Sequence, residues 1–231
     1  MLSFGKRLLR TAALKFGYDI VRVVEPRPTP RVAIKFTDLS RYRRITEPIP
    51  GMISSEAAEL LYGICVTQDV EGDVMEIGSW QGKSTSYLAR AVRDSGNGHM
   101  FAVDHFRGNI GKEGLYSVGD GLENLQAQFE DNMKAIGLQH VITTLPYFSE
   151  QAYEHLDNCV LRLLFIDGDH SESGVRKDIQ LYCPLVRAGG IVVFDDFDIT
   201  FPGLVSAVVE WVEHQDPRSV FVRGNMLVCK L

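Results

Sequence analysis

The stretch VLRLLFIDGDHSESGVRKDI, residues 160–179, decides the expected fold. Its first part, residues 160–167, is an almost continuous apolar run that ends in an aspartate, as is typical of a strand buried in a parallel sheet. Helical periodicity follows from residue 173 to residue 186, although Pro184 can end or kink that helix. The next apolar run is GGIVVFDD, residues 189–196. Strand, helix and strand in this order indicate a parallel βαβ unit.

The same alternation extends outward in both directions. Three apolar runs come before the central stretch: DVMEIG (73–78), HMFAVD (99–104) and VITTL (141–145). The other predicted helices are KSTSYLARAVRD (83–94), LENLQAQFEDNMKAIG (122–137), SEQAYEHL (149–156) and PGLVSAVVEWVEHQ (202–215). SVFVRG and MLVCK, joined at Gly224–Asn225, predict a closing β-hairpin. We therefore expect an α/β fold whose parallel sheet carries helices on both faces.

The first 50 residues differ in charge from the rest of the chain. They hold 11 Lys/Arg and 4 Asp/Glu, whereas residues 51–231 hold 13 Lys/Arg and 26 Asp/Glu. Residues 2–18 fit a short amphipathic helix, and three alternating prolines in residues 26–30 favour an extended linker. Ser54 and Ser55 then precede a helix that either can cap. We divide the chain into a basic arm with a Pro-rich linker, 1–50, and a main domain, 51–231.

Composition excludes several classes of protein. The acidic main domain argues against nucleic acid as a partner. No apolar run is long enough for a transmembrane helix, and Lys15 interrupts the N-terminal apolar stretch, so we expect no signal peptide. Four scattered cysteines predict buried thiols in a reducing cytosol and hence a cytoplasmic protein. The basic arm could contact anionic or glycolipid-bearing membrane at the inner face, or pack against a second subunit of a homo-oligomer.

The first strand end carries EIGSWQGKST, residues 76–85, which can be interpreted in several ways. A phosphate-binding Walker loop needs four residues between its first glycine and GK[ST], and only three separate Gly78 from Gly82. The dinucleotide pattern GxGxxG fails because residue 80 is tryptophan. The remaining interpretations are an ExGxxxGxS nucleoside-binding turn, formed by Glu76, Gly78, Gly82 and Ser84, and a tight turn without a ligand.

Two other strand ends carry polar residues suited to a nucleoside. Asp104 can hydrogen-bond both ribose hydroxyls of an adenosine ligand, or can simply be solvated. His105 follows it, either in contact with the ligand or on a surface loop. Ser149 comes after the third strand and can serve either as a helix N-cap or as part of the site. The glycine-rich residues 105–121 predict a long functional loop that closes over the site.

An acidic cluster is expected where the fourth and fifth strands end. Neighbouring strands lie about 4.8 Å apart, so Asp167, Asp195 and Asp196 should converge. Their mutual repulsion is relieved by a hard divalent cation, which prefers oxygen ligands. Alternatively, Asp195 or Asp169 caps the next element and no metal binds. His170, beside this cluster, is either a proton acceptor near neutral pH or a packing residue.

These motifs together resemble a known family. ExGxxxGxS, FIDGDH, VRKDI and GGIVVFDDF, within about residues 72–200, are similar to those of class I S-adenosylmethionine-dependent methyltransferases of the macrocin O-methyltransferase type. The resemblance implies a Rossmann-like, doubly wound sheet of seven strands. It also implies an S-adenosylmethionine cofactor, a magnesium or other divalent ion, and a small-molecule acceptor such as a sugar hydroxyl in glycan or antibiotic biosynthesis.

The resemblance also assigns roles to individual residues. Asp167, Asp195 and Asp196 match the metal ligands, and His170 matches the general base. The expected cofactor-binding residues are Glu76, Gly78, Ser79, Gly82, Ser84, Asp104, His105, Ser149 and Asp167. Competing hypotheses are a P-loop NTPase, a nicotinamide-dependent oxidoreductase and a non-catalytic nucleoside-binding module.

Overall fold

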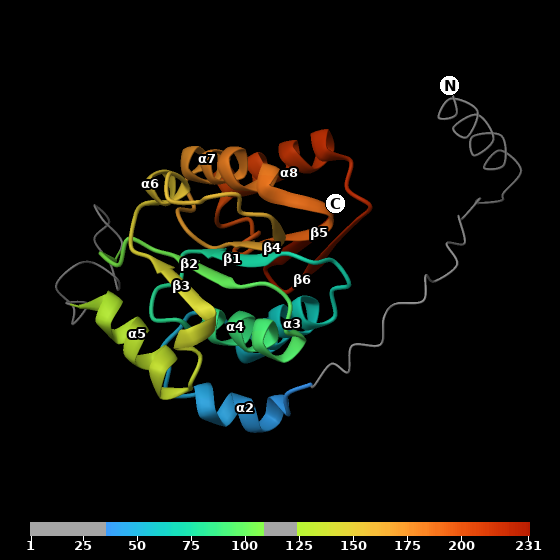
Figure 1. Ribbon diagram of the computed structural model, residues 1–231. Helices are drawn as coiled ribbons and strands as arrows, with labels where there is room; N and C mark the ends of the chain where they lie inside the picture. The colour runs from blue at the N-terminus through green and yellow to red at the C-terminus, as the bar shows by residue number, and fades with distance from the viewer. Residues whose placement is uncertain (1–35, 109–123) are drawn as a thin grey trace, which may run out of the picture. The chain divides into compact units, whose positions relative to one another are not determined.

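The computed structural model describes residues 36–108 and 124–231 (Figure 1). The α-helices are α2 (Leu39–Thr46), α3 (Ser55–Val66), α4 (Lys83–Ser95), α5 (Leu125–Ala135), α6 (Ser149–Tyr153), α7 (Glu172–Tyr182) and α8 (Pro202–Gln215), with short 3₁₀ turns at Gln139–Val141 and Cys183–Leu185. The strands are β1 (Asp73–Ile77), β2 (Met100–Val103), β3 (Ile142–Leu145), β4 (Leu161–Ile166), β5 (Val186–Phe194), β6 (Ser219–Arg223) and β7 (Met226–Lys230). The expected alternation of strands and helices, with its closing hairpin, is confirmed.

All seven strands belong to one sheet with the order β3-β2-β1-β4-β5-β7-β6. Strands β1 to β5 are parallel, and β7 pairs antiparallel with both β5 and β6. Helices α3, α4 and α5 cover one face of the sheet, and α6, α7 and α8 cover the other (Figure 1). The predicted doubly wound α/β fold is therefore correct. The strand order reverses beside β1, which is where ligands bind in such sheets.

Local sequence signals explain where the helices begin and end. Ser54 caps α3 by accepting a 3.1 Å hydrogen bond from the Ala57 amide, as its position in the sequence suggested. Pro184 lies in the 3₁₀ turn after α7, so the helix ends at Tyr182 rather than continuing to residue 186. Strand β5 consequently begins at Val186, earlier than the sequence pattern indicated.

The centre of the sheet is buried on both faces. All six residues of β4 are buried, including Arg162, which is 0% exposed. Its guanidinium donates to the carbonyls of Cys65, Gly72 and Asn97, at 2.5, 3.1 and 3.1 Å. The charge is thus satisfied by backbone acceptors at the amino end of the strand, away from the strand ends that carry the motifs. Sequence periodicity alone did not distinguish this arginine from a solvent-facing one.

Helix α2 lies within the segment that the sequence analysis assigned to the arm. Its Tyr42 and Thr46 are nevertheless buried, and the Tyr42 hydroxyl donates a 2.8 Å hydrogen bond to the Ser86 carbonyl of α4. The helix predicted at residues 2–18 and the linker at residues 26–30 lie outside the described residues, as does most of the predicted 105–121 loop. The division of the chain at residue 50 stays a prediction.

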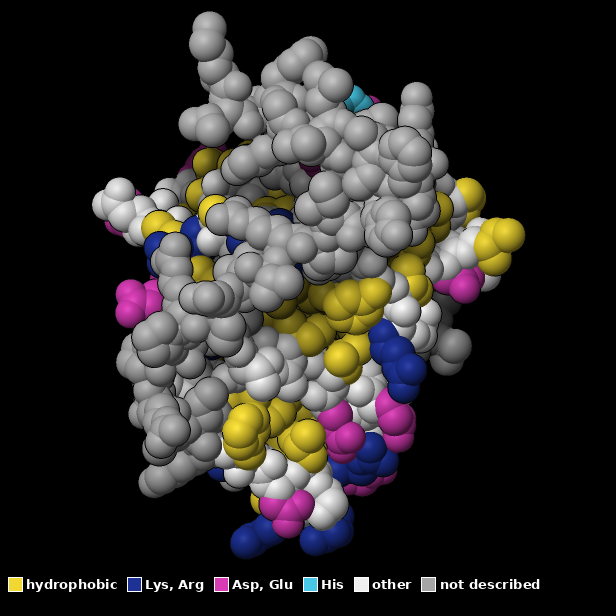
Figure 2. Space-filling model, turned by 90° about the vertical axis from the view of Figure 1, so that its right-hand side faces the viewer, with side chains coloured by type: hydrophobic (Ala, Val, Ile, Leu, Met, Phe, Trp, Pro, Cys, Tyr) yellow, Lys and Arg dark blue, Asp and Glu magenta, His cyan; other side chains and the backbone are white. Residues whose placement is uncertain are grey.

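The surface facing the viewer in Figure 2 carries several hydrophobic patches with acidic and basic side chains between them. Where described atoms are visible, charges of both signs alternate, and no continuous basic surface is seen there. Within the described part of the chain, no helix combines the length and apolarity needed to cross a membrane.

Candidate active site

A cavity of about 450 Å³ opens at the carboxyl ends of the parallel strands. Most of the predicted site residues line it. They are Gly78, Ser79, Ser84, Asp104, His105, Ser149, Asp167 and His170. The walls also include residues that were not among the predicted site residues, such as Trp80, Lys83, Tyr147, Phe148 and Asp178. Its volume falls within the usual range for small-molecule and cofactor sites.

The turn from β1 into α4 depends on two glycines with positive φ. At Gly78 (φ +93°), a Cβ atom would lie 1.9 Å from the Asp167 carbonyl oxygen. Only glycine therefore lets the ends of β1 and β4 approach this closely. At Gly82 (φ +92°), a Cβ atom would meet the Met133 side chain at 2.6 Å. Gly82 does not line the cavity, so its place in the motif is explained by packing against α5.

Glu76 lies beneath this turn and is 0% exposed. Its Oε2 accepts a hydrogen bond from the Thr85 hydroxyl, while Oε1 is buried without a hydrogen-bond partner among the described residues. Burial raises its pKa from 4.5 to about 7. No cation among the described residues pairs with this carboxylate, so its negative charge would suit an ammonium group on a ligand.

Asp104 organises both loops beside it. Its carboxylate accepts hydrogen bonds from the Trp80 amide (2.7 Å) and the Phe106 amide (2.6 Å). Both of these residues have positive φ, so the carboxylate stabilises an uncommon backbone conformation on each side of the cavity. The next residue, His105, lies against the ring of Phe148, with centroids 4.6 Å apart. An aromatic wall therefore borders the cavity near the end of β3.

Ser149 does not act as the helix cap that the sequence suggested. It is the first residue of α6, whose N-cap is Phe148, and no side chain caps this helix. The prediction is wrong because α6 begins at Ser149, one residue earlier than expected. Sequence patterns do not fix helix boundaries to a single residue. Ser149 lines the cavity, and its backbone carbonyl accepts a hydrogen bond from the Tyr182 hydroxyl.

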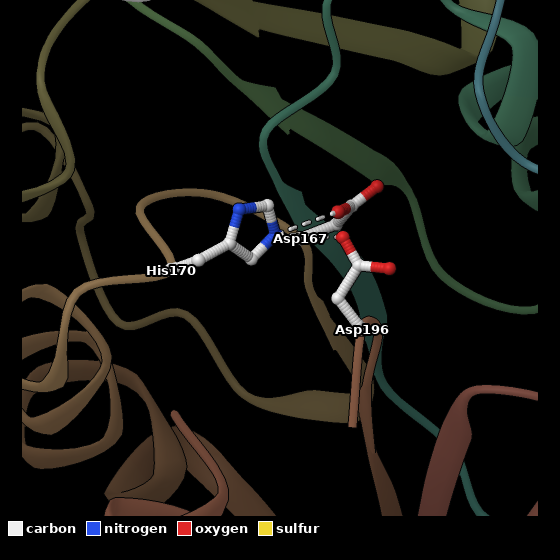
Figure 3. Close-up of side chains that lie close together, drawn as sticks. All are labelled: Asp167, His170 and Asp196. Carbon is white, nitrogen blue, oxygen red and sulfur yellow. Dashed lines mark ion pairs between the residues drawn. The ribbon is translucent and has the colours of Figure 1, made fainter. Parts of the chain in front are cut away.

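Asp167, His170 and Asp196 converge after β4 and β5 (Figure 3). His170 Nε2 lies 3.1 Å from Asp196 Oδ2 and 3.7 Å from Asp167 Oδ1. One potential ligand atom from each residue lies within 4.8 Å of the others. The two carboxylates raise the pKa of His170 to about 9. The pKa of Asp167 rises to about 8, mainly because the partly buried group is desolvated, whereas contact with His170 lowers the pKa of Asp196.

Asp195 is the third predicted metal ligand, but it is not one of these three converging residues. Its side chain is buried, and its Oδ1 has no hydrogen-bond partner among the described residues. Burial raises the pKa of Asp195 to about 6. The adjacent Asp196 turns toward the cluster with a φ of +51°. Consecutive aspartates therefore face different surroundings, and Asp195 remains only a predicted ligand.

This donor set fits a divalent cation. Two carboxylates and an imidazole converge, and further acidic groups lie close by. At neutral pH the protonated imidazole supplies the balancing positive charge, a role that a bound cation can take over. Carboxylate oxygens are the ligands that magnesium and manganese prefer, so Asp167 and Asp196 suit such an ion, with the His170 imidazole beside it.

Lys83 helps to exclude the phosphate-loop alternative. In a Walker loop the corresponding lysine reaches the ligand phosphates. Here the Lys83 ammonium instead donates a 2.6 Å hydrogen bond to the Thr46 carbonyl at the end of α2. A Cβ atom on Gly51 would lie 2.2 Å from Lys83 Cβ, so the preceding loop also packs directly on this side chain. The geometry and the shortened loop together do not support an NTPase.

Comparison with known proteins places the chain in a family. Residues 75–197 match the methyltransferase domain family. An uncharacterized protein of Acanthamoeba polyphaga mimivirus is 29% identical over 126 residues, which is 53% of this chain and 50% of that protein. The chain thus spans about half the length of this curated relative.

Solved structures share the fold. The apo structure of CalS11, described as a TDP-rhamnose 3'-O-methyltransferase in calicheamicin biosynthesis, is 15% identical, with a TM-score of 0.56 over 87% of this chain and 99% of that chain. An O-methyltransferase from Bacillus cereus in complex with S-adenosylhomocysteine (SAH) is also 15% identical, with a TM-score of 0.59 over 97% and 99%. The matched family model covers more than half of the chain, including every strand end described above except that of the C-terminal hairpin. The chain therefore belongs to the methyltransferase domain family.

Proposed function

We propose that this protein transfers a methyl group from S-adenosylmethionine to a hydroxyl of a small-molecule acceptor, with assistance from a divalent cation. One observation carries the proposal. The cavity formed by the Gly78 turn and Asp104 runs along the same sheet edge as the converging Asp167, His170 and Asp196. A donor bound in the cavity would therefore have its reactive end beside a cluster able to activate an acceptor.

Each part of the cavity suits one part of the cofactor. The turn at Gly78 and Ser79, with the buried Glu76 carboxylate beneath it, suits the amino-acid end. Asp104 suits the ribose hydroxyls, because each carboxylate oxygen retains a lone pair beyond the backbone bond that it already accepts. The aromatic wall of His105 and Phe148 suits stacking of a nucleobase.

The acidic cluster suits activation of the acceptor. Asp167 and Asp196 would hold the cation, with Asp195 adding negative charge from the adjacent position. A divalent cation bound there would lower the pKa of an acceptor hydroxyl. With the cation replacing the imidazolium as the balancing charge, His170 would be neutral, and its Nε2, left out of the coordination by Asp167 and Asp196, would accept the hydroxyl proton. The acceptor oxygen attacks the sulfonium methyl, a C–O bond forms as the C–S bond breaks, and SAH leaves.

The chemical class of the acceptor is proposed from a structural neighbour and from the sequence motifs, not from the geometry of the site. CalS11 is described as methylating a sugar nucleotide, TDP-rhamnose. A sugar hydroxyl is therefore our proposed acceptor, in keeping with the macrocin-type motifs. A homo-oligomeric state, a cytoplasmic location and contact of the basic arm with membrane or glycolipid remain proposals of the same kind.

The test has two parts. Thermal shift of the full chain with SAH, ATP and NAD separates the cofactor classes, and we expect stabilisation by SAH alone. His170→Ala should then reduce methyl transfer by about 100-fold or more, while the dissociation constant for SAH stays within about threefold. Stabilisation by ATP or NAD would contradict the proposed cofactor, and unchanged turnover would remove His170 as the base. SAH binding with no turnover on any sugar hydroxyl tested would favour the nucleoside-binding module.

A further inference from the structure

Phe201 lies against the ring of His170, the base of the proposed reaction. The centroids of the two rings are 4.6 Å apart, and the ring planes are tilted by 34°. This spacing lies within the range of favourable contacts between aromatic rings. Phe201 is not among the residues that line the cavity. Its contact is therefore with the imidazole itself and not with a ligand bound in the cavity.

The surrounding structure fixes the backbone of His170 more firmly than its ring. The flanking residues form a turn in which the Asp169 carboxylate accepts hydrogen bonds from the Ser171 amide, at 2.9 Å, and from the Ser171 hydroxyl, at 2.7 Å. His170 Nε2 lies 3.1 Å from Asp196 and 3.7 Å from Asp167, but it has no aligned hydrogen-bond partner among the described residues. The carboxylates thus attract the imidazole without holding it at one angle.

The χ2 torsion of His170 decides which ring atom faces the two carboxylates (Figure 3). This torsion has a broad, roughly twofold distribution in histidine, so rotamer preference alone does not fix the ring. A half-turn about χ2 would put Cε1 where Nε2 now lies. Both carboxylate contacts are made by Nε2, so neither of them fixes the ring through its second nitrogen. Packing against Phe201 is the contact that can set the ring angle.

Phe201 is itself held firmly at the start of α8. Its amide donates a 2.9 Å hydrogen bond to the Asp198 carbonyl, and its own carbonyl accepts a 3.0 Å hydrogen bond from the Val205 amide. The ring packs against the buried hydrophobic cluster on this side of the sheet. Helix α8 also begins directly against α7, because a Cβ atom on Gly203 would lie 2.9 Å from Glu172 Cβ. The ring of Phe201 therefore has a rigid support next to the loop that carries the base.

We infer that Phe201 is a positioning residue, whose ring holds the imidazole of His170 at the angle at which Nε2 faces Asp167 and Asp196. This inference rests on the proposed function, in which Nε2 accepts the hydroxyl proton. A base must point at the proton that it removes, and a displacement of about 1 Å can cost 100-fold in rate. Loss of the ring should therefore lower kcat and leave the binding of acceptor and SAH almost unchanged.

Three variants separate the effect of a flat ring from the filling of space. Phe201→Leu keeps an apolar side chain without a flat ring, Phe201→Ala removes most of the side chain, and Phe201→Tyr keeps the ring. With S-adenosylmethionine and a panel of nucleoside diphosphate sugars, we expect the first two to lose about tenfold or more in kcat. Phe201→Tyr should stay within about threefold of the wild-type protein. In all three, KM for the acceptor and the dissociation constant for SAH should change by less than about threefold.

Trp211→Leu is the matched control. Trp211 is another aromatic residue of α8 that packs against the same hydrophobic cluster. Its ring contacts Phe194, with centroids 5.3 Å apart. This variant also removes an aromatic ring from the helix, but it leaves the contact between Phe201 and His170 in place. We expect a lower thermal midpoint and an unchanged kcat.

Two further measurements distinguish positioning from a general loss of structure. In a His170→Ala background, adding Phe201→Ala should change the residual rate by less than about twofold, because Phe201 acts through the imidazole. The second measurement needs no acceptor. In protein with isotope-labelled histidine, NMR relaxation of the His170 ring should give the order parameter of a rigid group, about 0.85, and Phe201→Ala should lower it below about 0.6.

The outcomes separate the inference from the proposed function. If the wild-type protein neither binds SAH nor methylates any sugar of the panel, the proposed function fails, and the NMR measurement still decides whether Phe201 holds the ring. A His170 ring that is equally ordered in the wild-type protein and in Phe201→Ala overturns the inference. So does a wild-type kcat in Phe201→Leu, or a loss of the same size in Trp211→Leu or in the His170→Ala background. Should Phe201→Ala fail to fold, the same measurements on Phe201→Leu and Phe201→Tyr decide.

Discussion

The side-chain amide of Asn225 donates a 2.8 Å hydrogen bond to Oδ1 of Asp196. Asn225 lies in the turn between β6 and β7, and its carbonyl also accepts a 2.8 Å hydrogen bond from the Phe197 amide. Asp196 itself has a φ of +51°, which is uncommon for a residue other than glycine. The C-terminal hairpin thus holds the aspartate in the orientation in which its other oxygen faces His170.

Asn225→Ala should therefore weaken binding of a divalent cation without unfolding the protein. Partners of this kind typically contribute about tenfold or more in metal affinity. We expect the dissociation constant for Mn²⁺, measured by calorimetry, to rise by about that factor. The thermal midpoint without metal should change by less than a few degrees, because the side chain is exposed. An unchanged Mn²⁺ affinity would show that the hairpin does not support this site.

Gly78→Ala should be far more damaging than Gly96→Ala, although both glycines have positive φ. A Cβ atom at Gly78 would lie 1.9 Å from the Asp167 carbonyl, whereas one at Gly96 would meet nothing within 4 Å. Gly96→Ala should cost about 1 kcal/mol of unfolding free energy, from backbone strain alone. Gly78→Ala should cost at least twice as much and abolish SAH binding. If urea denaturation showed equal losses of unfolding free energy for the two variants, the close approach of β1 and β4 would be contradicted.

Arg162→Met should destabilise the fold strongly. The variant fills similar space but leaves the carbonyls of Cys65, Gly72 and Asn97 without their buried donor. Each buried acceptor left unsatisfied costs about 1–3 kcal/mol, so we expect a total loss of about 3 kcal/mol or more in denaturant unfolding. A loss below about 1 kcal/mol would mean that water or relaxation replaces the guanidinium.

Glu76→Gln should change how stability depends on pH. The pKa of Glu76 is raised from 4.5 in the unfolded chain to about 7 in the folded protein. The stabilisation from its proton is therefore fully present below about pH 4.5 and is lost as the pH rises to about 7. This loss is on the order of 3 kcal/mol, and glutamine, which does not titrate, avoids it.

The check is a comparison of unfolding free energies of the two proteins between pH 5 and pH 8, without ligand. The difference between them isolates Glu76 from the other acidic groups that titrate in this range. We expect the unfolding free energy of the variant to rise relative to that of the wild-type protein as the pH rises. The variant should also bind SAH more weakly, because the cofactor ammonium loses its carboxylate partner. If the curves of unfolding free energy against pH ran parallel for the two proteins, the raised pKa of Glu76 would be contradicted.

The strand and helix pattern could be predicted because four of the five apolar runs in residues 73–196 end in Gly or Asp, and a helical period comes between each run and the next. The strand ends then indicated where Asp104, Asp167 and His170 would meet one cavity. Pattern could not show that Asp195 and Asp196 face different surroundings, because that difference depends on the positive φ of Asp196. The VRKDI motif contains Asp178, but pattern could not show that this residue lines the cavity, because it does so only through the packing of α7 beside α6.

The most direct test of the account is a crystal structure of the full chain grown with SAH and Mn²⁺, with anomalous diffraction used to locate the metal. We predict SAH in the cavity between the Gly78 turn and the aromatic wall, with its ribose at Asp104. The manganese peak should lie among Asp167, His170 and Asp196, beside the sulfur of SAH. A nucleoside bound elsewhere, or a metal peak away from these three side chains, would contradict it.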